Sequence, residues 1–311
     1  MSQGELRGRV LRATAGFADV ATDRGVLRCR LRGRLKKEAL STDLIVVGDF
    51  VTVSPVEEGV GRIESIEPRR TVFSRRHPGR GGRHREDVLI ANLDLLVCVF
   101  AVSFPIMKPR LLDRFLVIAE SQGIVPIVVL NKIDEEGAEE VRELLEPHRA
   151  IGYEIFETST VTGEGIDALR ERMRGQVSAL VGPSGVGKSS LVNAIEPGLD
   201  LRVGETREVD GKGRHTTRVA SLHPLTGGGY IADTPGIREL AAFEIPDEEL
   251  PKCFPEFRPL LGGCAFRNCT HLNEPDCAIL AAVDEGVIDE DRYESYAKMR
   301  LDEERPERFG H

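Results

Sequence analysis

Residues 182–190, GPSGVGKSS, match the phosphate-binding loop pattern G-x-x-x-x-G-K-[ST]. The apolar run VSALV precedes this loop, and SSLVNAI after it has the pattern of a helix start. The glycines let successive backbone N–H groups point at phosphate oxygens, and the helix dipole adds to that attraction. We expect Lys188 to reach the β- and γ-phosphates and the Ser189 hydroxyl to ligate Mg²⁺. The predicted phosphate-binding residues are Gly182, Pro183, Ser184, Gly185, Val186, Gly187, Lys188, Ser189 and Ser190.

Two segments after this loop carry residue types that bind a metal ion and a γ-phosphate. Asp233 opens the tetrapeptide DTPG at the end of an apolar run, where its carboxylate can hold Mg²⁺ directly or through water. The Gly236 N–H could contact the γ-phosphate. In GKGRHTTR the hydroxyls of Thr216 and Thr217 both suit Mg²⁺ in a loop ordered by the triphosphate, and the pattern does not choose between them. The predicted magnesium ligands are Ser189, Thr217 and Asp233, with Thr216 as the alternative to Thr217.

A third group of residues lies before the phosphate loop and suits a guanine base. The tetrapeptide NKID follows the apolar run IVPIVVL. Its Asp134 carboxylate can accept hydrogen bonds from N1–H and N2–H₂ of guanine, whereas adenine offers no such pair of donors. We expect Asn131 to bridge loops and touch the base, and Lys132 to lie along it. TSTVTGEG ends the next apolar run, and a backbone N–H near Ser159 and Thr160 would meet guanine O6.

The C-terminal part of the chain holds a cysteine and histidine motif with metal-ligand spacing. The sequence CAFRNCTHLNEPDC reads C-x₄-C-x-H-x₅-C, and three thiolates with one imidazole complete a tetrahedral zinc shell with no open position. Such a site is structural, and in a loop-rich segment it supplies local folding free energy. The predicted zinc ligands are Cys264, Cys269, His271 and Cys277. We expect Cys29 and Cys98 in the core, and the zinc shell does not need Cys253.

The elements that must position these residues follow from hydrophobic periodicity. From residue 88, apolar runs typical of buried strands alternate with amphipathic helical runs, which indicates an α/β domain with a mostly parallel sheet. The base-reading and phosphate candidates all follow strand-like runs, and the carboxyl ends of parallel strands meet at one edge of a sheet. Moving the chain ends to another loop therefore leaves such a site intact. We predict a circularly permuted P-loop GTPase domain over residues 88–248, with its base-reading half first.

The segments on either side of this domain have different patterns. Residues 4–70 carry about five short alternating runs, which favours an OB-type β-barrel, with an SH3-type barrel as the alternative. We place this barrel at residues 1–73. Residues 74–87, SRRHPGRGGRHRED, are rich in Gly and Arg without periodicity, and we expect a basic linker or arm. Residues 249–311 are predicted to form a zinc-binding α domain.

Charge is distributed unevenly along the chain. Residues 1–90 hold 18 Lys and Arg against 12 Asp and Glu, whereas residues 91–311 hold 24 against 39. This asymmetry indicates either a polyanionic partner that docks on the N-terminal part or an arginine-rich solvated surface. The sequence contains no run of 18 apolar residues and no secretory h-region. We therefore expect a cytoplasmic protein, monomeric and without a membrane partner.

The order of these motifs closely resembles that of the circularly permuted GTPases, and among them the ribosome small-subunit-dependent GTPase A family (RsgA, also called YjeQ). The resemblance covers essentially the whole chain, from the barrel pattern through NKID, GPSGVGKSS, GRHTT and DTPG to the cysteine motif. It implies an N-terminal OB barrel, a permuted GTPase domain and a C-terminal zinc domain. It also implies GTP hydrolysis coupled to late maturation of the small (30S) ribosomal subunit, with rRNA binding.

The chain departs from familiar signalling GTPases at the residue after DTPG. Many of those enzymes have Gln there to orient the attacking water, but here the residue is Ile237, so we expect slow intrinsic turnover. His215 is the nearest candidate for positioning water, and a surface histidine is the alternative interpretation. The predicted catalytic residues are Lys188, His215, Thr216 and Thr217.

Three other functions compete with a small-subunit GTPase. A GTPase acting on another RNA, such as tRNA, would be stimulated by that RNA as well as by subunits. A GTP-dependent RNA-binding switch with negligible turnover is compatible with Ile237. A small-molecule kinase is disfavoured, because NKID has no role in binding ATP.

Overall fold

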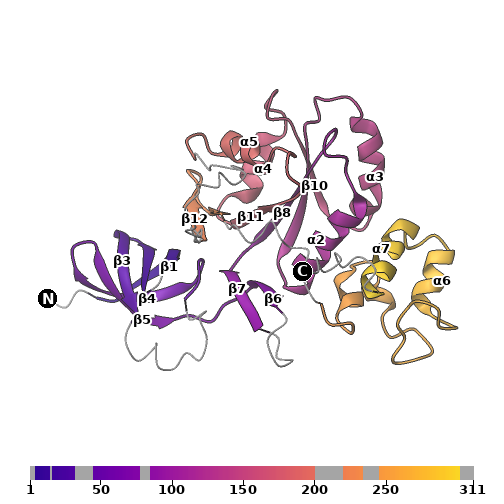
Figure 1. The fold of residues 1–311 in the computed structure, drawn as a ribbon, viewed down its shortest axis with the longest axis horizontal. Coiled ribbons are helices and arrows are strands. Elements are labelled where there is room, and N and C mark those ends of the chain that lie inside the picture. The colour runs from indigo at the N-terminus through magenta and orange to yellow at the C-terminus, as the bar shows by residue number, and fades with distance from the viewer. Residues whose placement is uncertain are drawn as a thin grey trace, which may run out of the picture. The chain divides into compact units, whose positions relative to one another are not determined.

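The computed structural model describes residues 4–14, 16–31, 45–77, 85–199, 220–233 and 245–301 (Figure 1). These residues form two compact units. The first unit contains the described parts of 1–96, 166–180 and 188–238, and the second unit contains those of 97–165, 181–187 and 239–311. Within the described residues, no helix is long and apolar enough to cross a membrane.

The first unit begins with a five-stranded barrel. Its strands are β1 (Leu6–Thr14), β2 (Phe17–Thr22), β3 (Gly25–Leu31), β4 (Phe50–Glu57) and β5 (Val60–Ile66). They pair in the order β1-β2-β3-β5-β4, and β1 pairs again with β4, which closes the sheet into a barrel of the predicted OB type. Alternate residues point inward, so that Val10, Val20 and Ile63 are fully buried while Arg28 and Arg30 face outward.

The segment predicted as a basic linker differs from that prediction. Strands β6 (Val72–His77) and β7 (Arg85–Ala91) form an antiparallel pair. Residues 74–77 and 85–87 of the predicted linker therefore belong to paired strands. The register sets Arg75 opposite Asp87 and Arg76 opposite Glu86. The Gly- and Arg-rich composition concealed this pairing, and residues 78–84 lie outside the described part of the chain.

The rest of the first unit positions the start of the phosphate loop. It contains α4 (Ile166–Met173), β11 (Val177–Val181), α5 (Lys188–Ile195), β12 (Ser221–Pro224) and β13 (Tyr230–Asp233). β11 and β13 are parallel, so their carboxyl ends lie at the same edge. Arg170 of α4 donates to the carbonyl oxygens of Ala194 and Ile195 at 2.9 and 2.8 Å, which satisfies the C-terminal end of α5.

The second unit supplies the base-reading half. Its elements are β8 (Leu95–Ala101), α2 (Pro109–Ser121), β9 (Val125–Asn131), α3 (Ala138–Ala150) and β10 (Glu154–Thr158). β9 lies between β8 and β10 and runs parallel to β10, with Asn131 opposite Thr158. β8 is buried along its whole length, as expected for a strand covered on both faces, and Cys98 lies in it.

The C-terminal part of the second unit is short helices and loops around an aromatic core. It comprises η2 (Leu250–Cys253), η3 (Arg258–Leu260), α6 (Ala278–Asp284) and α7 (Glu290–Arg300). The rings of Phe254 and Phe257 stack at 5.0 Å, and Tyr296 meets Phe254 edge-on at 5.4 Å. Cys253 packs in this core, a burial that the sequence did not predict, whereas the predicted burial of Cys29 in the barrel core and of Cys98 in β8 is confirmed.

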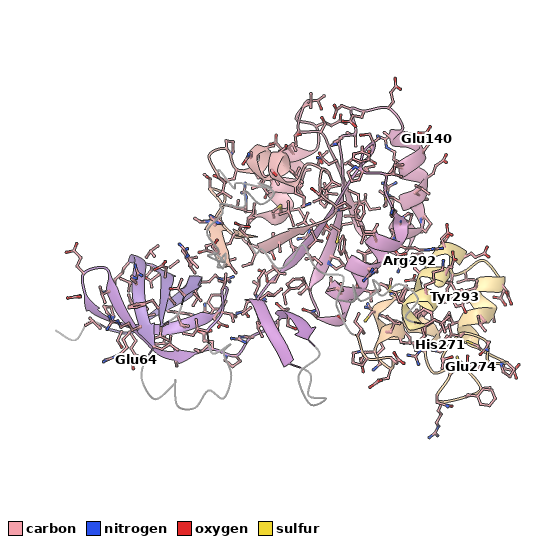
Figure 2. All side chains as sticks on the ribbon, in the orientation of Figure 1. Glu64, Glu140, His271, Glu274, Arg292 and Tyr293 are labelled. Atoms are coloured by element: carbon pink, nitrogen blue, oxygen red, sulfur yellow. The ribbon has the colours of Figure 1, made fainter. Side chains whose placement is uncertain are left out.

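A buried ionic cluster of Asp113, His148, Glu256, Arg292 and Ser295 joins α2 and α3 to this C-terminal part. Asp113 accepts hydrogen bonds from His148 Nε2 (2.7 Å), from Arg292 and from Ser295. Arg292, labelled in Figure 2, also donates to both carboxylate oxygens of Glu256, at 2.9 and 3.3 Å. Burial alone would raise the pKa of Asp113, but the His148 hydrogen bond and the Arg292 charge outweigh it and lower that pKa.

Candidate functional site

Asn131 connects the base-reading loop to the phosphate loop. It ends β9 and is fully buried. Its Nδ2 donates to the Val186 carbonyl oxygen at 2.9 Å, and its Oδ1 accepts from the Thr158 hydroxyl at 3.0 Å. One side chain therefore ties the ends of β9 and β10 to the loop 182–187, as the sequence predicted when it assigned Asn131 a bridging role.

Lys132 and Asp134 follow at the carboxyl end of β9. Lys132 has a left-handed backbone (φ 63°), which turns the chain sharply after the strand. Its Nζ donates to the Phe104 carbonyl oxygen at 3.0 Å, so the lysine stem is held along the loop surface. The Asp134 side chain is exposed and is thus accessible to a ligand.

The loop after β10 is a compact turn built on Ser159. The Ser159 hydroxyl accepts from the amides of Val161 and Thr162, at 3.2 and 3.0 Å. The Ser159 amide itself donates to the Glu164 carbonyl oxygen at 3.0 Å. Because that donor is already bonded, the Thr160 amide is the better candidate of the two for a base oxygen.

Two glycines of the phosphate loop allow its backbone to pack closely on the residues beneath it. Gly182 and Gly187 have φ of 140° and 91°, values that residues with side chains rarely adopt. A Cβ at Gly182 would lie 2.1 Å from the Val99 carbonyl oxygen, and one at Gly187 would lie 2.5 Å from Asn131 Nδ2. Only glycine fits at both positions, so the loop keeps its bare backbone against the residues below it.

The phosphate loop leads directly into α5, which begins at Lys188. The first turn of α5 contains Ser189 and Ser190, and both follow the loop as predicted. Asp233 ends β13 and is exposed at the edge where β11 gives way to the loop. Four predicted site residues lie outside the described part of the chain, namely His215, Thr216, Thr217 and Gly236, and so does Ile237.

The four predicted zinc ligands converge. Their ligand atoms all lie within 4.8 Å of one another, and we call Cys264, Cys269, His271 and Cys277 the cysteine cluster. The Cys264 and Cys277 sulfurs are 3.8 Å apart, and His271 Nδ1 lies 3.5 Å from each of them. Tetrahedral Zn²⁺ with ordinary bond lengths would require ~3.8 Å between two sulfurs and ~3.6 Å between sulfur and nitrogen. The cluster therefore fits a zinc ion.

Without a metal ion, burial favours the neutral forms of the groups in the cysteine cluster. Burial lowers the pKa of His271, which keeps its ring neutral and able to ligate. Burial is the chief cause that raises the pKa of Cys269 to about 12. A bound cation is what would convert such thiols to thiolates.

Glu274 organises the loop that carries His271, although sequence reasoning did not single it out. Its carboxylate accepts from the Thr270 amide and hydroxyl, both at 2.6 Å, and from the Leu272 amide at 3.1 Å. These hydrogen bonds, led by that of the Thr270 side chain, hold the pKa of Glu274 far below its ordinary value. The Tyr293 hydroxyl donates to the His271 carbonyl oxygen at 2.9 Å (Figure 2). The sequence signal that could have identified Glu274 is the presence of an acidic residue between two metal ligands of the motif.

Comparison with known protein families identifies the chain. One family model, the RsgA N-terminal domain, matches residues 7–63, and a second, the RsgA GTPase, matches residues 66–243. The second match alone spans more than half of the chain. The chain belongs to the RsgA GTPase family.

Relatives with the RsgA name resemble the chain over nearly its full length. The small ribosomal subunit biogenesis GTPase RsgA of Gemmatimonas aurantiaca is 47% identical over 296 residues, which cover 94% of this chain and 96% of that protein. The crystal structure of YjeQ from Thermotoga maritima has a TM-score of 0.79 at 36% identity, covering 96% and 98% of the two chains. YloQ, described as a circularly permuted GTPase, has a TM-score of 0.77 at 31% identity over 99% and 98%. The predicted RsgA fold class is therefore confirmed.

Proposed function

We propose that this chain hydrolyses GTP to GDP and phosphate in the biogenesis of the small ribosomal subunit. The observation that carries the proposal is the Asn131 side chain, which joins the NKID loop to the phosphate loop by a 2.9 Å hydrogen bond. A base-reading loop fixed to a phosphate cradle is what guanine nucleotide binding requires. The names of relatives that cover almost the whole chain supply the ribosomal context.

For the base, Asp134 accepts hydrogen bonds from guanine N1–H and N2–H₂, since its carboxylate is exposed at the end of β9. Asn131 touches the base, and Lys132 lies along its plane with Nζ anchored on Phe104. The Thr160 amide donates to guanine O6, because the Ser159 amide is bonded elsewhere. GTP is therefore favoured over ATP.

For the phosphates, the backbone amides of the loop 182–187 and Lys188 hold the β- and γ-phosphates. Ser189, Thr217 and Asp233 are the proposed residues for Mg²⁺, which neutralises charge on the phosphates when bound. Gly236 is proposed for the γ-phosphate. Lys188 stabilises the negative charge that develops on the transferred group.

The attacking water needs a positioning group other than residue 237, because isoleucine cannot hydrogen-bond to water. We propose His215 for this role, with Thr216 and Thr217 beside it in the same loop. Slow hydrolysis by the free enzyme follows, and a bound partner that aligns these side chains with the attacking water raises kcat rather than merely lowering KM.

For RNA, we assign the main docking surface to the barrel and to residues 74–87. The barrel stacks arginines on aromatic rings: Arg28 and Arg30 lie 5.1 and 4.8 Å from the Phe17 ring. Stacked guanidinium groups on an outward face are suited to rRNA phosphates and bases. The cysteine cluster holds one structural Zn²⁺, and the protein acts in the cytoplasm as a monomer.

The test is the GTPase rate of the full chain with and without purified small subunits. We expect strong stimulation that falls steeply with salt, while the basal rate changes little with salt. Arg28→Gln/Arg30→Gln should lose stimulation, whereas the control Arg142→Gln/Arg149→Gln, on α3, should keep it. Equal stimulation by free tRNA would favour the other-RNA GTPase, and absence of turnover in every condition would favour the RNA-binding switch.

A further inference from the structure

The segment from Phe104 to Arg114 in the second unit carries exposed groups that the nucleotide site does not use. Phe104 is 77% exposed and Ile106 is 76% exposed, two residues apart on the loop that leads from β8 into α2. Single exposed apolar side chains are ordinary, but two exposed apolar side chains that directly precede a cation-lined pocket in the chain are a feature of binding surfaces.

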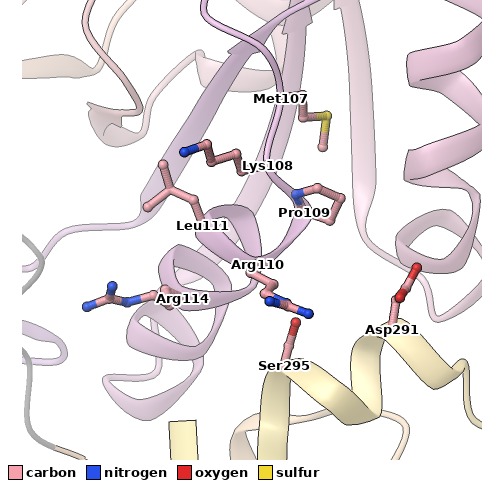
Figure 3. Close-up of a pocket in the computed structure, with 8 residues that line it drawn as sticks. All are labelled: Met107, Lys108, Pro109, Arg110, Leu111, Arg114, Asp291 and Ser295. Carbon is pink, nitrogen blue, oxygen red and sulfur yellow. The ribbon is translucent and has the colours of Figure 1, made fainter. Parts of the chain in front are cut away.

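A pocket of about 650 Å³ follows directly on this loop, between the start of α2 and α7 (Figure 3). We call it the α2 pocket. Its lining residues are Met107, Lys108, Pro109, Arg110, Leu111, Arg114, Asp291 and Ser295. Pockets of this volume hold ligands of nucleotide size. The lining combines apolar side chains, which suit a base, with three cationic side chains, which suit a phosphate.

The charges at the α2 pocket favour an anion. The first turn of α2 has no acidic residue, so its positive dipole end adds to Lys108, Arg110 and Arg114. Arg110 pairs with Glu294 at 2.6 Å, but their side chains are 43% and 45% exposed, and such a pair contributes little and can open for a phosphate. Asp291 is the anionic group in the lining, and a carboxylate can accept from a ribose 2′-OH. These cations lie in the half of the chain that is acidic overall.

We propose that Phe104 and the α2 pocket bind an unpaired stretch of RNA. One base stacks on the Phe104 ring, a neighbouring nucleotide enters the pocket, and phosphates meet Lys108 and Arg110. Aromatic stacking flanked by cations is how proteins hold single-stranded nucleic acid. The inference rests on the proposed function, which supplies an RNA partner, and adds a second contact surface formed by the start of α2 and by α7.

The segment that carries Phe104 is hydrogen-bonded directly to the guanine-reading loop. The Phe104 carbonyl oxygen accepts from Lys132 Nζ at 3.0 Å, and Ser103 is hydrogen-bonded to Glu135. Pro105 lies against the phosphate loop, since a Cβ at Gly185 would be 3.6 Å from its Cδ. RNA on Phe104 thus contacts a segment that touches both loops of the nucleotide site.

Photo-crosslinking on the full chain tests the ligand class. In Phe104→p-benzoylphenylalanine, irradiation with purified small subunits should give an adduct that ribonuclease removes. The same substitution at Val161, which is 82% exposed in the same unit, is the control and should give little adduct. A ribosomal-protein adduct at position 104, or an RNA yield no higher than at position 161, would overturn the proposal.

Binding measurements separate this inference from the proposed function. With a ten-nucleotide unpaired oligoribonucleotide, Phe104→Ala should weaken affinity about 5- to 100-fold. Lys108→Gln/Arg110→Gln should lower the slope of log affinity against log salt by about 1.4. Arg142→Gln/Arg149→Gln is the charge-matched control, and zinc content with the thermal melt checks folding. Unchanged affinity and slope would overturn the inference, while loss of subunit stimulation in Arg28→Gln/Arg30→Gln would still uphold the proposed function. If the variants weaken oligonucleotide binding but small subunits do not stimulate GTP hydrolysis by the native chain, the inference is upheld and the proposed function fails.

Discussion

Replacing Arg292 by Met should destabilise the second unit by about 3–5 kcal/mol at pH 7, the usual cost of breaking a buried ion pair. The Arg292 side chain is 2% exposed and donates to the Asp113 and Glu256 carboxylates. Asp113 keeps His148 and Ser295 as donors, whereas Glu256 loses both of its bonds to Arg292. Met retains the volume of the arginine stem, so the loss reports on charge rather than on a cavity.

The loss of unfolding free energy in Arg292→Met, relative to the native chain, should become smaller as the pH falls from 7 toward 5. In the native protein the pKa of Asp113 is lowered, so its contribution is present above the unfolded value of about 3.9 and is lost as pH falls through the folded pKa. Without the Arg292 charge, the effect of burial on Asp113 is less fully offset, so the pKa of Asp113 rises and the folded variant takes up a proton at a higher pH than the native protein does. Its stability relative to the native chain therefore rises on acidification.

Urea unfolding followed by tyrosine emission measures the effect, because the chain has no Trp and four Tyr. Three of these, Tyr153, Tyr293 and Tyr296, lie in the second unit. Arg110→Met is the matched control, since it breaks the exposed Arg110–Glu294 pair between the same two helices and should cost less than about 1 kcal/mol. If Arg292→Met costs no more than Arg110→Met, the ionic cluster does not hold these helices together.

Four further outcomes test the nucleotide and zinc sites. Asp134→Asn should shift preference from GTP toward XTP, because the amide can donate to the xanthine carbonyl; full GTP affinity with no gain for XTP in a binding titration would refute the base assignment. Lys188→Ala and Ser189→Ala should each nearly abolish turnover, and an unchanged kcat in either would remove the phosphate loop from the mechanism. Cys269→Ala should lose the single zinc ion found by metal analysis of native protein prepared without chelator, and a native protein without zinc would contradict the cluster. Glu274→Gln should weaken zinc affinity about 10- to 100-fold in a chelator competition, and an unchanged affinity would show that its hydrogen bonds do not orient the His271 loop.

From the sequence we could predict the convergence of the cysteine cluster and the link between Asn131 and the phosphate loop, because these residues lie within continuous motifs. The phosphate loop, NKID and the cysteine cluster each occupy fewer than fifteen residues, and each has a spacing set by its own chemistry. The Arg292–Asp113 bond joins residues 179 positions apart, so no local pattern announces it. The pairing of β6 with β7 was missed for a related reason: each strand is specified by the other, the sequence between them is rich in glycine, and neither strand has a strong apolar alternation of its own.

The bond from Asn131 to Val186 has a consequence for how the chain is made. Synthesis runs from the N-terminus, so Asn131 leaves the ribosome 55 residues before its partner. At about 5–20 residues per second this interval lasts ~3–11 s. Throughout that time the Asn131 side chain at the end of β9 lacks its native acceptor, the Val186 carbonyl oxygen. The guanine-reading loops also lack the phosphate loop that completes the nucleotide site. A nascent chain can therefore be stabilised by nucleotide only after residue 189 has emerged, which makes the second half of translation the point at which GTP can first assist folding.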